Sequence, residues 1–596
     1  MKPVDAMLEV LRDEGVTRVF GNPGTTELPF VEAVTAAPDL QYVLGVQEAS
    51  VVAMADGYAR ATGRPAFVSL HIAAGLANGV VGLLNACRSR TPLVVTAGQQ
   101  DRRHLAQDPM LSGDLVGIAR AAVKHAFDVQ HAHDLTVMLR RAFALAVQPP
   151  AGPVFLSVPM DLLEEETPVA PPAPRSRLGG LGPAAGWPEA AERLAAARRP
   201  GIVAGDGVGR DGAVAELVAL AEATGAAVFH QPMHDGVDFP TVHPLYAGML
   251  DARHSAIRSA LEGHDVVLIA GTRAFMAHHY EPGSPIPAGT DVIQLDSDPG
   301  EPGRNFPVVL GLTGGVRATL AALASQLAGK VPQAPSRIEA IGPVHEAARA
   351  RVRERALAGR GDAPMDPLAA AHAVVSGLPA DSVVVEEAIT SGLLLRSVLP
   401  LERPRSYVHT VGGGLGSGIG AAIGSRMGDP SRPVVAVLGD GCTLFGLQGL
   451  WSAAHYRVPV TFVVLNNGEY RTLKETAARR RRSRAARRGD GGLELTPPRL
   501  DLAPATGLLG LGDGTPDGPD GLDLAPPELD FTRVAEFFGI TAVRARSTDH
   551  LTEAVARAAA GTEPVLIDAR VTGHADGVRL AHGHTGGAFT TSGGTA

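Results

Sequence analysis

Two polar side chains follow neighbouring β-rich runs in the last third of this 596-residue chain. Asp440 comes shortly after the run Val434–Leu438, and Asn467 comes shortly after Val460–Leu465. Their separation equals one strand–helix–strand crossover, and parallel strands bring their carboxyl ends to the same edge of a sheet. Carboxylate and amide oxygens suit Mg²⁺, and the backbone carbonyl of Glu469 could add a third ligand. The spacing therefore predicts a Mg²⁺ site at Asp440, Asn467 and Glu469.

The glycines beside Asp440 are compatible with a bound phosphate. Gly439 and Gly441 would let the backbone approach an anion closely, and the helix expected after Gly441 would present free N–H groups to it. The simpler alternative is a strand–turn–helix in which the glycines serve only the turn, and a lone Gly-Asp-Gly favours that alternative. The second polar strand end at Asn467 makes the diphosphate interpretation the more specific one.

Gly439-Asp440-Gly441 followed by Asn466-Asn467 resembles the cofactor motif of thiamine-diphosphate enzymes. Further segments resemble the benzoylformate decarboxylases, a branch of the superfamily of acetolactate synthases and pyruvate decarboxylases. These segments are Phe20–Phe30, Gln47–Ala49, Ala55–Arg60, Ser69–Gly75, Thr96–Gln100 and Gly413–Gly416. The resemblance covers about residues 1–470 and 527–570. It implies thiamine diphosphate and Mg²⁺ as cofactors, and a homo-oligomer, at least a dimer and usually a tetramer, with cofactor sites between subunits.

The resemblance assigns catalytic roles to four residues. Glu48 matches the glutamate that hydrogen-bonds the pyrimidine N1′ of the cofactor and shuttles a proton, although in isolation it would be a solvated charge at a helix start. His71 and His278 match two histidines that act as general acids and bases, with His279 as the alternative to His278. Without the resemblance, His71 would be a structural histidine at a strand end. Thr25 takes the position of a serine that binds the substrate carboxylate.

The same resemblance implies cofactor contacts in the last third of the chain. Leu415 matches the apolar residue that props the cofactor into a V shape, where a plain core leucine is the alternative. The carbonyl of Gly413 would accept a hydrogen bond from the 4′-amino group. Thr390 and Ser391 could bind diphosphate oxygens, in a stretch with fewer hydroxyls than the relatives have. The predicted cofactor-binding residues are Glu48, Thr390, Ser391, Gly413, Leu415, Asp440, Gly441, Cys442 and Asn467.

The resemblance leaves more than one activity open. The leading hypothesis is a non-oxidative decarboxylase that converts a benzoylformate-like 2-keto acid into an aldehyde and CO₂. The alternative is a carboligase of the acetolactate-synthase type, which joins the same acyl-anion equivalent to a second carbonyl. His71 and His278 together favour protonation, and hence the decarboxylase. A non-catalytic protein with a relic fold is the contrasting class, which the intact Glu48, Asp440 and Asn467 argue against.

The elements that must position these residues form three α/β blocks. Strand-like runs alternate with Ala-rich helical segments in residues 1–165, 187–330 and 364–572, which predicts βαβ units and parallel sheets. The predicted fold class is therefore α/β, with three doubly wound domains. The resemblance identifies them as pyrimidine-binding, middle and diphosphate-binding domains. The Gly/Thr/His-rich residues 573–596 are predicted to be a disordered tail.

An insertion at about 474–527 interrupts the third block. It contains the basic run Arg479–Arg488 and then a stretch rich in Gly, Pro and Asp. One interpretation is a solvated, disordered segment, and the other is a basic lid or docking arm for an anionic substrate or partner. Because the insertion falls where substrate specificity is usually set, the sequence determines the substrate less well than the cofactor.

Bulk composition argues against several other classes of protein. The net charge of −9 at pH 7 gives no support for nucleic-acid binding. No apolar run reaches the ~20 residues that a membrane-spanning helix needs. The two cysteines, Cys87 and Cys442, lack metal-type spacing, and the N-terminus lacks a signal-peptide core. We therefore expect a cytoplasmic enzyme whose partners are a small-molecule 2-keto acid and further copies of itself, with no nucleic-acid or membrane partner.

Overall fold

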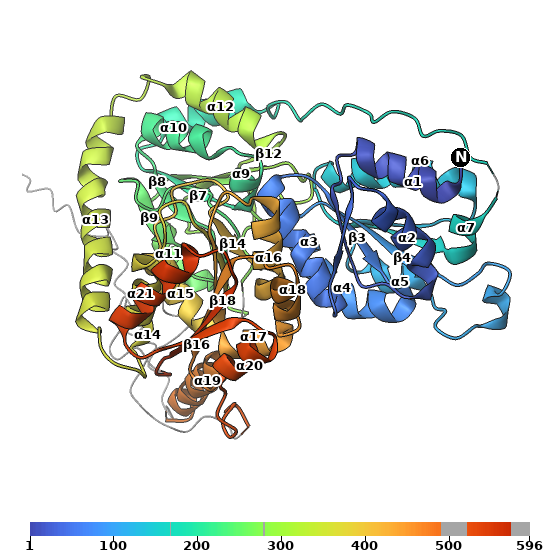
Figure 1. Ribbon diagram of the computed structural model, residues 1–596. Coiled ribbons are helices and arrows are strands. Elements are labelled where there is room, and N and C mark those ends of the chain that lie inside the picture. The colour runs from blue at the N-terminus through green and yellow to red at the C-terminus, as the bar shows by residue number, and fades with distance from the viewer. Residues whose placement is uncertain (167, 278–279, 490–520, 574–596) are drawn as a thin grey trace, which may run out of the picture.

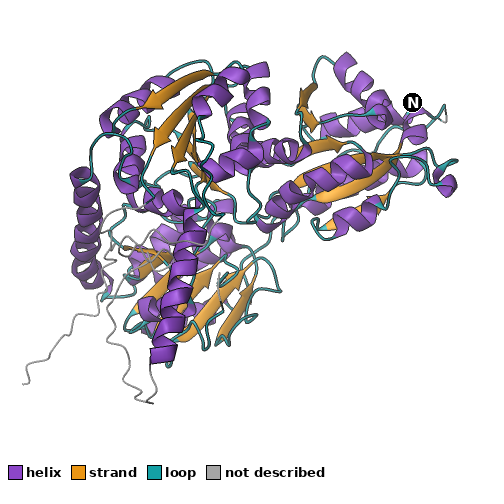
Figure 2. Cartoon of the chain, turned by 90° about the horizontal axis from the view of Figure 1, so that it is seen from below, coloured by secondary structure: helices purple, strands orange, loops and turns teal. Residues whose placement is uncertain are grey.

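Three six-stranded sheets follow one another along the chain in the computed structural model (Figure 1). The structure describes residues 1–166, 168–277, 280–489 and 521–573, with the side chains of 479 and 482–489 left out. The strand pairings within all three sheets are parallel, and helices cover the sheets (Figure 2). The predicted fold class is confirmed.

The first sheet has the strand order β2-β1-β3-β4-β6-β5 and carries the N-terminal candidate residues at its carboxyl edge. Its strands are β1 Arg18–Gly21, β2 Gln41–Leu44, β3 Ala66–Leu70, β4 Leu93–Gln99, β5 His125–Asp128 and β6 Val154–Pro159. The helices around it are α1 Pro3–Asp13, the 3₁₀ turn η1 Thr25–Glu27, α2 Leu28–Ala36, α3 Glu48–Thr62, α4 Ile72–Arg88, η2 Leu105–Gln107, α5 Leu115–Arg120, α6 Ala132–Val147 and α7 Met160–Glu164.

The second sheet repeats this plan with the order β12-β11-β10-β7-β8-β9. Its strands are β7 Pro200–Ala204, β8 Ala227–His230, β9 Tyr246–Met249, β10 Val266–Ala270, β11 Asp291–Asp296 and β12 Leu310–Thr313. Its helices are α8 Trp187–Ala196, α9 Asp206–Arg210, α10 Val214–Thr224, α11 His254–Leu261 and α12 Val316–Leu327. The long helix α13, Ala334–Ala358, leads to the third sheet.

The third sheet has the order β14-β13-β15-β16-β18-β17, so the two strands before Asp440 and Asn467 are its central neighbours. Its strands are β13 Val383–Glu387, β14 Tyr407–His409, β15 Val434–Gly439, β16 Val460–Asn466, β17 Thr541–Ala545 and β18 Val565–Arg570. Its helices are α14 Pro367–Ser376, α15 Ile389–Val398, α16 Ser417–Gly428, α17 Asp440–Gly446, α18 Gly449–His455, α19 Arg471–Gly489, α20 Phe531–Phe537 and α21 Thr548–Ala559.

The strands that the sequence pattern missed all lie at sheet edges. They are β5, β9, β12, β14 and β17. An edge strand pairs on one side only and is partly exposed, so its sequence lacks the continuous apolar run that marks a central strand. The exposure of β5 and β9 fits this explanation, whereas β14 is buried but only three residues long.

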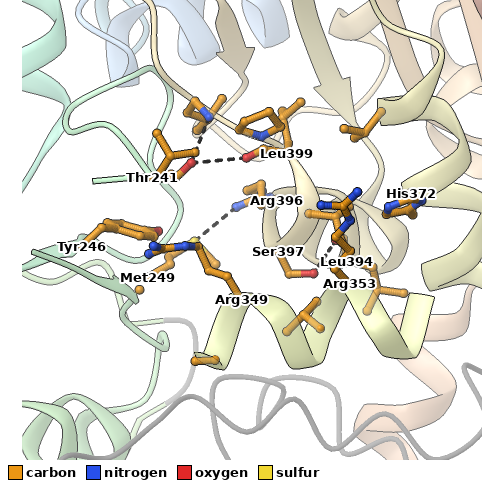
Figure 3. Close-up of a pocket in the computed structure, with 18 of the residues that line it drawn as sticks. Thr241, Tyr246, Met249, Arg349, Arg353, His372, Leu394, Arg396, Ser397 and Leu399 are labelled. Atoms are coloured by element: carbon orange, nitrogen blue, oxygen red, sulfur yellow. Dashed lines mark hydrogen bonds between the residues drawn. The ribbon is translucent and has the colours of Figure 1, made fainter. Parts of the chain in front are cut away.

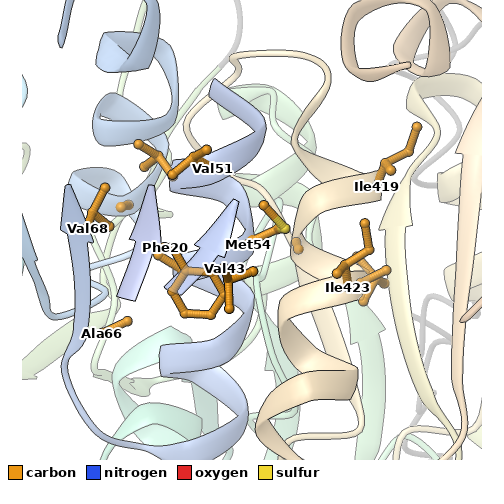
Figure 4. Close-up of a cluster of buried hydrophobic side chains, with 14 of the residues drawn as sticks. Phe20, Val43, Val51, Met54, Ala66, Val68, Ile419 and Ile423 are labelled. Atoms are coloured by element: carbon orange, nitrogen blue, oxygen red, sulfur yellow. The ribbon is translucent and has the colours of Figure 1, made fainter. Parts of the chain in front are cut away.

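One hydrophobic cluster joins the first and third sheets across helices α3 and α16. Phe20 and Met54 belong to it together with Ile419 and Ile423 of α16 (Figure 4). The helices cross closely, because a Cβ atom at Gly424 would lie 1.8 Å from the carbonyl oxygen of Met54. A residue without a side chain is therefore required at this crossing.

Gly424→Ala is expected to lower the free energy of unfolding by at least about 1–3 kcal/mol, because overpacking displaces the α3 backbone. Thermal unfolding of the full chain would measure the effect. Gly361→Ala is the matched control, since a Cβ atom there meets no described atom within 4 Å. Equal unfolding temperatures for the two variants would contradict the close crossing.

Two predicted segments lie partly or wholly outside the described residues. The basic run Arg479–Arg488 falls in helix α19, whereas residues 490–520 of the insertion and the predicted tail from 574 onward are outside the described part of the chain. None of the helices in the described ranges is both long and apolar enough to cross a bilayer.

Candidate active site

The carboxyl ends of β15 and β16 bring Asp440 and Asn467 together. The two strands pair directly, with Gly439 opposite Leu465. Asp440 is 5% exposed, and its carboxylate accepts hydrogen bonds from the N–H groups of Asn467 at 3.0 Å and Gly468 at 2.6 Å. Burial raises the pKa of Asp440 because desolvation disfavours the charged carboxylate. The predicted convergence of the two strand ends is thus present in the fold.

The oxygen donors at this edge fit Mg²⁺. They are the Asp440 carboxylate, the Asn467 amide oxygen and the carbonyl of Glu469, whose side chain pairs instead with Arg471 and Lys474. Mg²⁺ takes few protein ligands and completes its octahedron with phosphate and water oxygens. Across the described residues, no group of three or more His, Cys, Asp or Glu side chains could hold a metal. A cation here would also offset the cost of burying the Asp440 charge.

Glu387, at the end of β13, anchors the turn that leads from Leu415 into α16. Its buried carboxylate accepts the N–H groups of Gly416 at 2.8 Å, Ser417 at 3.1 Å and Gly418 at 2.8 Å. Burial raises the pKa of Glu387 to about 7, although the three N–H groups favour the charged form. Sequence analysis gave this residue no role. Its signal was the pair Glu386-Glu387 at the end of a strand that begins with three valines.

The turn with Gly413 and Leu415 is also fixed from the first domain. Gly413 has a φ of +81°, which glycine adopts readily, and Leu415 is half-buried. Asn85 of α4 donates to the carbonyl of Gly414 at 2.8 Å and accepts from its N–H at 3.0 Å. Hydrogen bonds to Glu387 and to Asn85 therefore hold this turn in a defined conformation.

The residues predicted to contact the diphosphate lie at the starts of α15 and α17. The hydroxyl of Thr390 is 2.9 Å from that of Thr472 in α19, and Ser391 is buried. Cys442 is buried as well, and burial raises its pKa well above the usual value for a thiol. Its thiol therefore stays protonated, which leaves the backbone N–H as the group suited to an anion.

Glu48 is the first residue of α3 and is 7% exposed. Its carboxylate accepts hydrogen bonds from Asn22 at 2.9 Å and from Asn78 at 3.1 Å. Gln47 caps the helix by accepting the N–H of Ser50, so Glu48 is free to turn inward. The alternative of a solvated charge at a helix start does not hold for this residue.

His71 lies beside Glu48 and is paired with a second glutamate. Its Nδ1 atom is 2.9 Å from the carboxylate of Glu27, which also accepts the N–H groups of Gly24 at 2.8 Å and Gly98 at 2.9 Å. A Cβ atom at Gly75 would lie 3.0 Å from the Glu48 carboxylate and 3.4 Å from His71 Cβ, so both side chains flank one glycine.

The Glu27 pairing fixes the orientation of the His71 ring. A carboxylate on one ring nitrogen selects the tautomer and directs the other nitrogen away from it. The side chain of His71 is 22% exposed, so this second nitrogen can reach a bound molecule. Glu27 is the residue that sequence analysis missed here. The only local signal was a glutamate two positions after Thr25.

The remaining predicted catalytic residues differ in how they are placed. Thr25 opens the 3₁₀ turn η1 and is exposed, whereas its neighbour Thr26 is buried and donates to Glu27 at 2.7 Å. His278 and its alternative His279 lie outside the described residues. Thr25 thus lies on the same 3₁₀ turn as Glu27, the partner of His71.

Helix α4 connects the two halves of the candidate site. Asn78 contacts Glu48, and Asn85 contacts the turn at Gly414. These two residues are about two helical turns, or roughly 10 Å, apart along the helix. Within one chain, Glu48 and the turn at Gly414 of the third domain therefore have separate hydrogen-bond networks, both anchored on α4.

Three family models match the chain. They are described as the N-terminal TPP binding domain, the central domain and the C-terminal TPP binding domain of thiamine pyrophosphate enzymes, at residues 1–131, 188–323 and 390–569. These ranges include Glu48, the middle sheet, and the strand ends with Asp440 and Asn467.

Individual relatives agree with the models. Benzoylformate decarboxylase of Pseudomonas aeruginosa is 36% identical over 95% of this chain and 98% of its own length. Acetolactate synthase isozyme 3 large subunit of Escherichia coli is 27% identical over 78% and 82%. The structure of a thiamine diphosphate-dependent 4-hydroxybenzoylformate decarboxylase from Rhodococcus jostii superposes with a TM-score of 0.78 at 31% identity, covering 96% and 99%.

These matches confirm the resemblance drawn from the sequence motifs. The three models together cover more than half of the chain, and each overlaps one of the three observed sheets. The donor set at Asp440 and the buried Glu48 fit the two ends of the cofactor that the models name. The chain belongs to the thiamine pyrophosphate enzyme family, and thiamine diphosphate is its cofactor.

Proposed function

We propose that this enzyme catalyses the non-oxidative decarboxylation of an aryl 2-keto acid, with Mg²⁺ holding the diphosphate of the cofactor. The bond between the keto carbon and the carboxylate breaks, CO₂ leaves, and a proton takes its place on carbon to give the aldehyde. When bound, thiamine diphosphate supplies the nucleophilic carbon and the electron sink. The observation that carries the proposal is the convergence of buried Glu48 and the oriented His71 on Gly75.

Glu48 is proposed to hold and move a proton at the pyrimidine N1′ of the cofactor. A glutamate suits this role because its carboxyl can give up and regain a proton while remaining in place. Asn22 and Asn78 hold both carboxylate oxygens, so the side chain has a fixed orientation. Since both partners are neutral amides, neither can take the proton in competition with the cofactor.

His71 is proposed to deliver the proton that replaces CO₂, with Thr25 binding the substrate carboxylate. Glu27 accepts from one ring nitrogen, which leaves the other directed at the reacting carbon. The Thr25 hydroxyl is exposed on the same turn and can donate to a carboxylate oxygen. His278 remains the proposed second acid–base group.

Asp440, Asn467 and the carbonyl of Glu469 are proposed to bind Mg²⁺. The N–H groups of Gly441 and Cys442 and the side chains of Thr390 and Ser391 would bind the diphosphate at the adjoining helix starts. Gly413 and Leu415 would hold the pyrimidine end. We also propose a homo-oligomer, at least a dimer, in which a second copy completes each site. Light scattering of the holoenzyme would measure the mass, and a monomer with full activity would contradict this.

A panel of 2-keto acids tests the proposed activity. The protein is incubated with thiamine diphosphate, Mg²⁺ and either benzoylformate, 4-hydroxybenzoylformate or pyruvate. Equimolar CO₂ and aryl aldehyde are expected with the first two substrates. Hydroxyketones or acetolactate in place of aldehyde would instead identify a carboligase, the activity named for the acetolactate synthase relative. No product from any member of the panel would contradict the proposal.

Glu27→Gln is expected to lower kcat/KM by about 10–100-fold, a part of the 10²–10⁴-fold that a general acid contributes. The reason is that glutamine cannot fix the His71 ring as a carboxylate does. Because Glu27 acts through His71, the double variant with His71→Ala should be no slower than His71→Ala alone. Glu32→Gln, an exposed glutamate in α2, is the control. Additive losses in the double variant would contradict this positioning role.

A further inference from the structure

A cavity lies away from the candidate active site, between the middle domain, α13 and the third domain (Figure 3). Its volume is about 390 Å³, within the range of small-molecule pockets. Tyr246, Gly248 and Met249 of β9 form one wall, and α14 and α15 form the opposite wall. Most of the remaining lining is aliphatic, including Leu394 and Leu399.

One side of helix α13 lines this cavity. Its lining residues are His345, Ala348, Arg349, Val352 and Arg353. They recur at the spacing of three and four residues that places side chains on one side of a helix. Arg349 is partly buried there, and a buried cation costs free energy unless a negative group accompanies it, whereas Arg353 is exposed to solvent.

The arginines of this cavity have unused hydrogen-bonding capacity. The Nη1 atom of Arg349 and the Nε atom of Arg396 are buried without a partner among the described residues. Arg396 pairs through its Nη2 atom with Glu386 at 3.0 Å. No described carboxylate pairs with Arg349 or Arg353, and none of the described lining residues is acidic. Figure 3 shows Arg349 extending from α13 toward Tyr246 and Met249.

The histidines around the cavity add no charge at neutral pH. Burial lowers the pKa of His234 and, to a smaller extent, the pKa of His345 and His372. The positive charge of the walls therefore belongs to the arginines, which stay charged at every accessible pH. The cavity thus combines an apolar body with fixed cationic donors.

Strand β13 lies between this cavity and the part of the third domain that is proposed to bind the cofactor. Successive side chains of a strand point to opposite faces of the sheet. Glu386 faces Arg396 and Tyr407, whereas Glu387 faces the N-terminus of α16. The cavity therefore lies on the other face of the third sheet from the turn that carries Leu415, and it is distinct from the site assigned above.

We propose that this cavity binds a small monocarboxylate with an apolar or aromatic body. The guanidinium of Arg349 would bind the carboxylate through charge-assisted hydrogen bonds, and the aliphatic walls with Tyr246 would cover the body. A carboxylate supplies the negative charge that the described side chains around Arg349 lack.

Binding of 4-bromobenzoate to the full-length holoenzyme tests this proposal. Calorimetric titration would compare the wild type with Arg349→Met, which keeps the apolar stem and removes the charge. Arg351→Met, on the exposed side of the same helix, is the matched control. We expect an at least tenfold higher Kd for Arg349→Met and an unchanged Kd for Arg351→Met. The active site could bind the same carboxylate, so only a component that depends on Arg349 counts.

Two further measurements keep the test decisive. Ala348→Phe, which fills the cavity, should abolish the same component even where Arg349→Met proves unstable. The uncharged analogue 4-bromobenzamide should bind at least tenfold more weakly than the acid. A bromine anomalous signal beside Arg349 in crystals of the complex would support the proposal. Equal affinity of Arg349→Met and wild type, or equal affinity for acid and amide, would overturn it.

Discussion

Replacing Glu48 by glutamine is expected to reduce kcat by about 10²–10⁴-fold while the cofactor still binds, because general acid–base catalysis accounts for that range. Glutamine has nearly the same shape but carries no exchangeable carboxyl proton. Its NH₂ group would face the amide donors of Asn22 and Asn78, and one of these amides would turn over to accept from it. The side chains around position 48 are therefore expected to keep their arrangement, while the proton transfer is lost.

The measurement pairs turnover with cofactor affinity in the same preparations. Steady-state kinetics with benzoylformate gives kcat, and quenching of intrinsic fluorescence by added thiamine diphosphate gives the Kd. Glu32→Gln, on the exposed surface of α2, should leave both values unchanged. Wild-type turnover in Glu48→Gln would remove Glu48 from the mechanism, whereas loss of cofactor binding would make it a binding residue.

Asp440→Ala is expected to weaken Mg²⁺ and cofactor binding together by at least about 100-fold, since losing only a group that supports a metal ligand already costs 10–100-fold. The variant also leaves the N–H groups of Asn467 and Gly468 without their acceptor. We therefore expect a loss of stability of about 1–3 kcal/mol as well.

Titrating Mg²⁺ at fixed thiamine diphosphate, and the cofactor at fixed Mg²⁺, would measure the two affinities separately. Asp381→Ala is the control, because that aspartate is exposed in the same domain. Thermal unfolding of the apoprotein separates the loss of the two backbone acceptor contacts from the loss of metal. A weaker cofactor Kd with unchanged Mg²⁺ affinity would contradict the metal assignment.

Of these two residues, the local sequence pattern identified Asp440, whereas Glu48 was identified only through the resemblance to thiamine-diphosphate enzymes. Asp440 and Asn467 follow apolar runs of buried strands, and such runs are short, continuous and easily recognised. Once two parallel strands are neighbours, their carboxyl ends lie at the same edge of the sheet. The crossover length therefore predicted that Asp440 and Asn467 would lie close together. The edge strands β5 and β9 escaped the same reasoning, because half-exposed strands need no apolar run.

The sequence by itself determined the α/β fold class and the meeting of the strand ends that precede Asp440 and Asn467, because these depend on periodicity and on the length of one crossover. Its resemblance to known enzymes determined the cofactor family. The tertiary structure alone decided which distant groups meet. Glu27 reaches His71, Glu387 reaches the turn after Leu415, and Asn85 reaches that turn from another domain. These contacts join residues on separate elements, and side-chain hydrogen bonds between distant elements produce no periodic pattern in the sequence. Packing of whole domains sets them, as it sets the arginine-lined cavity beside α13.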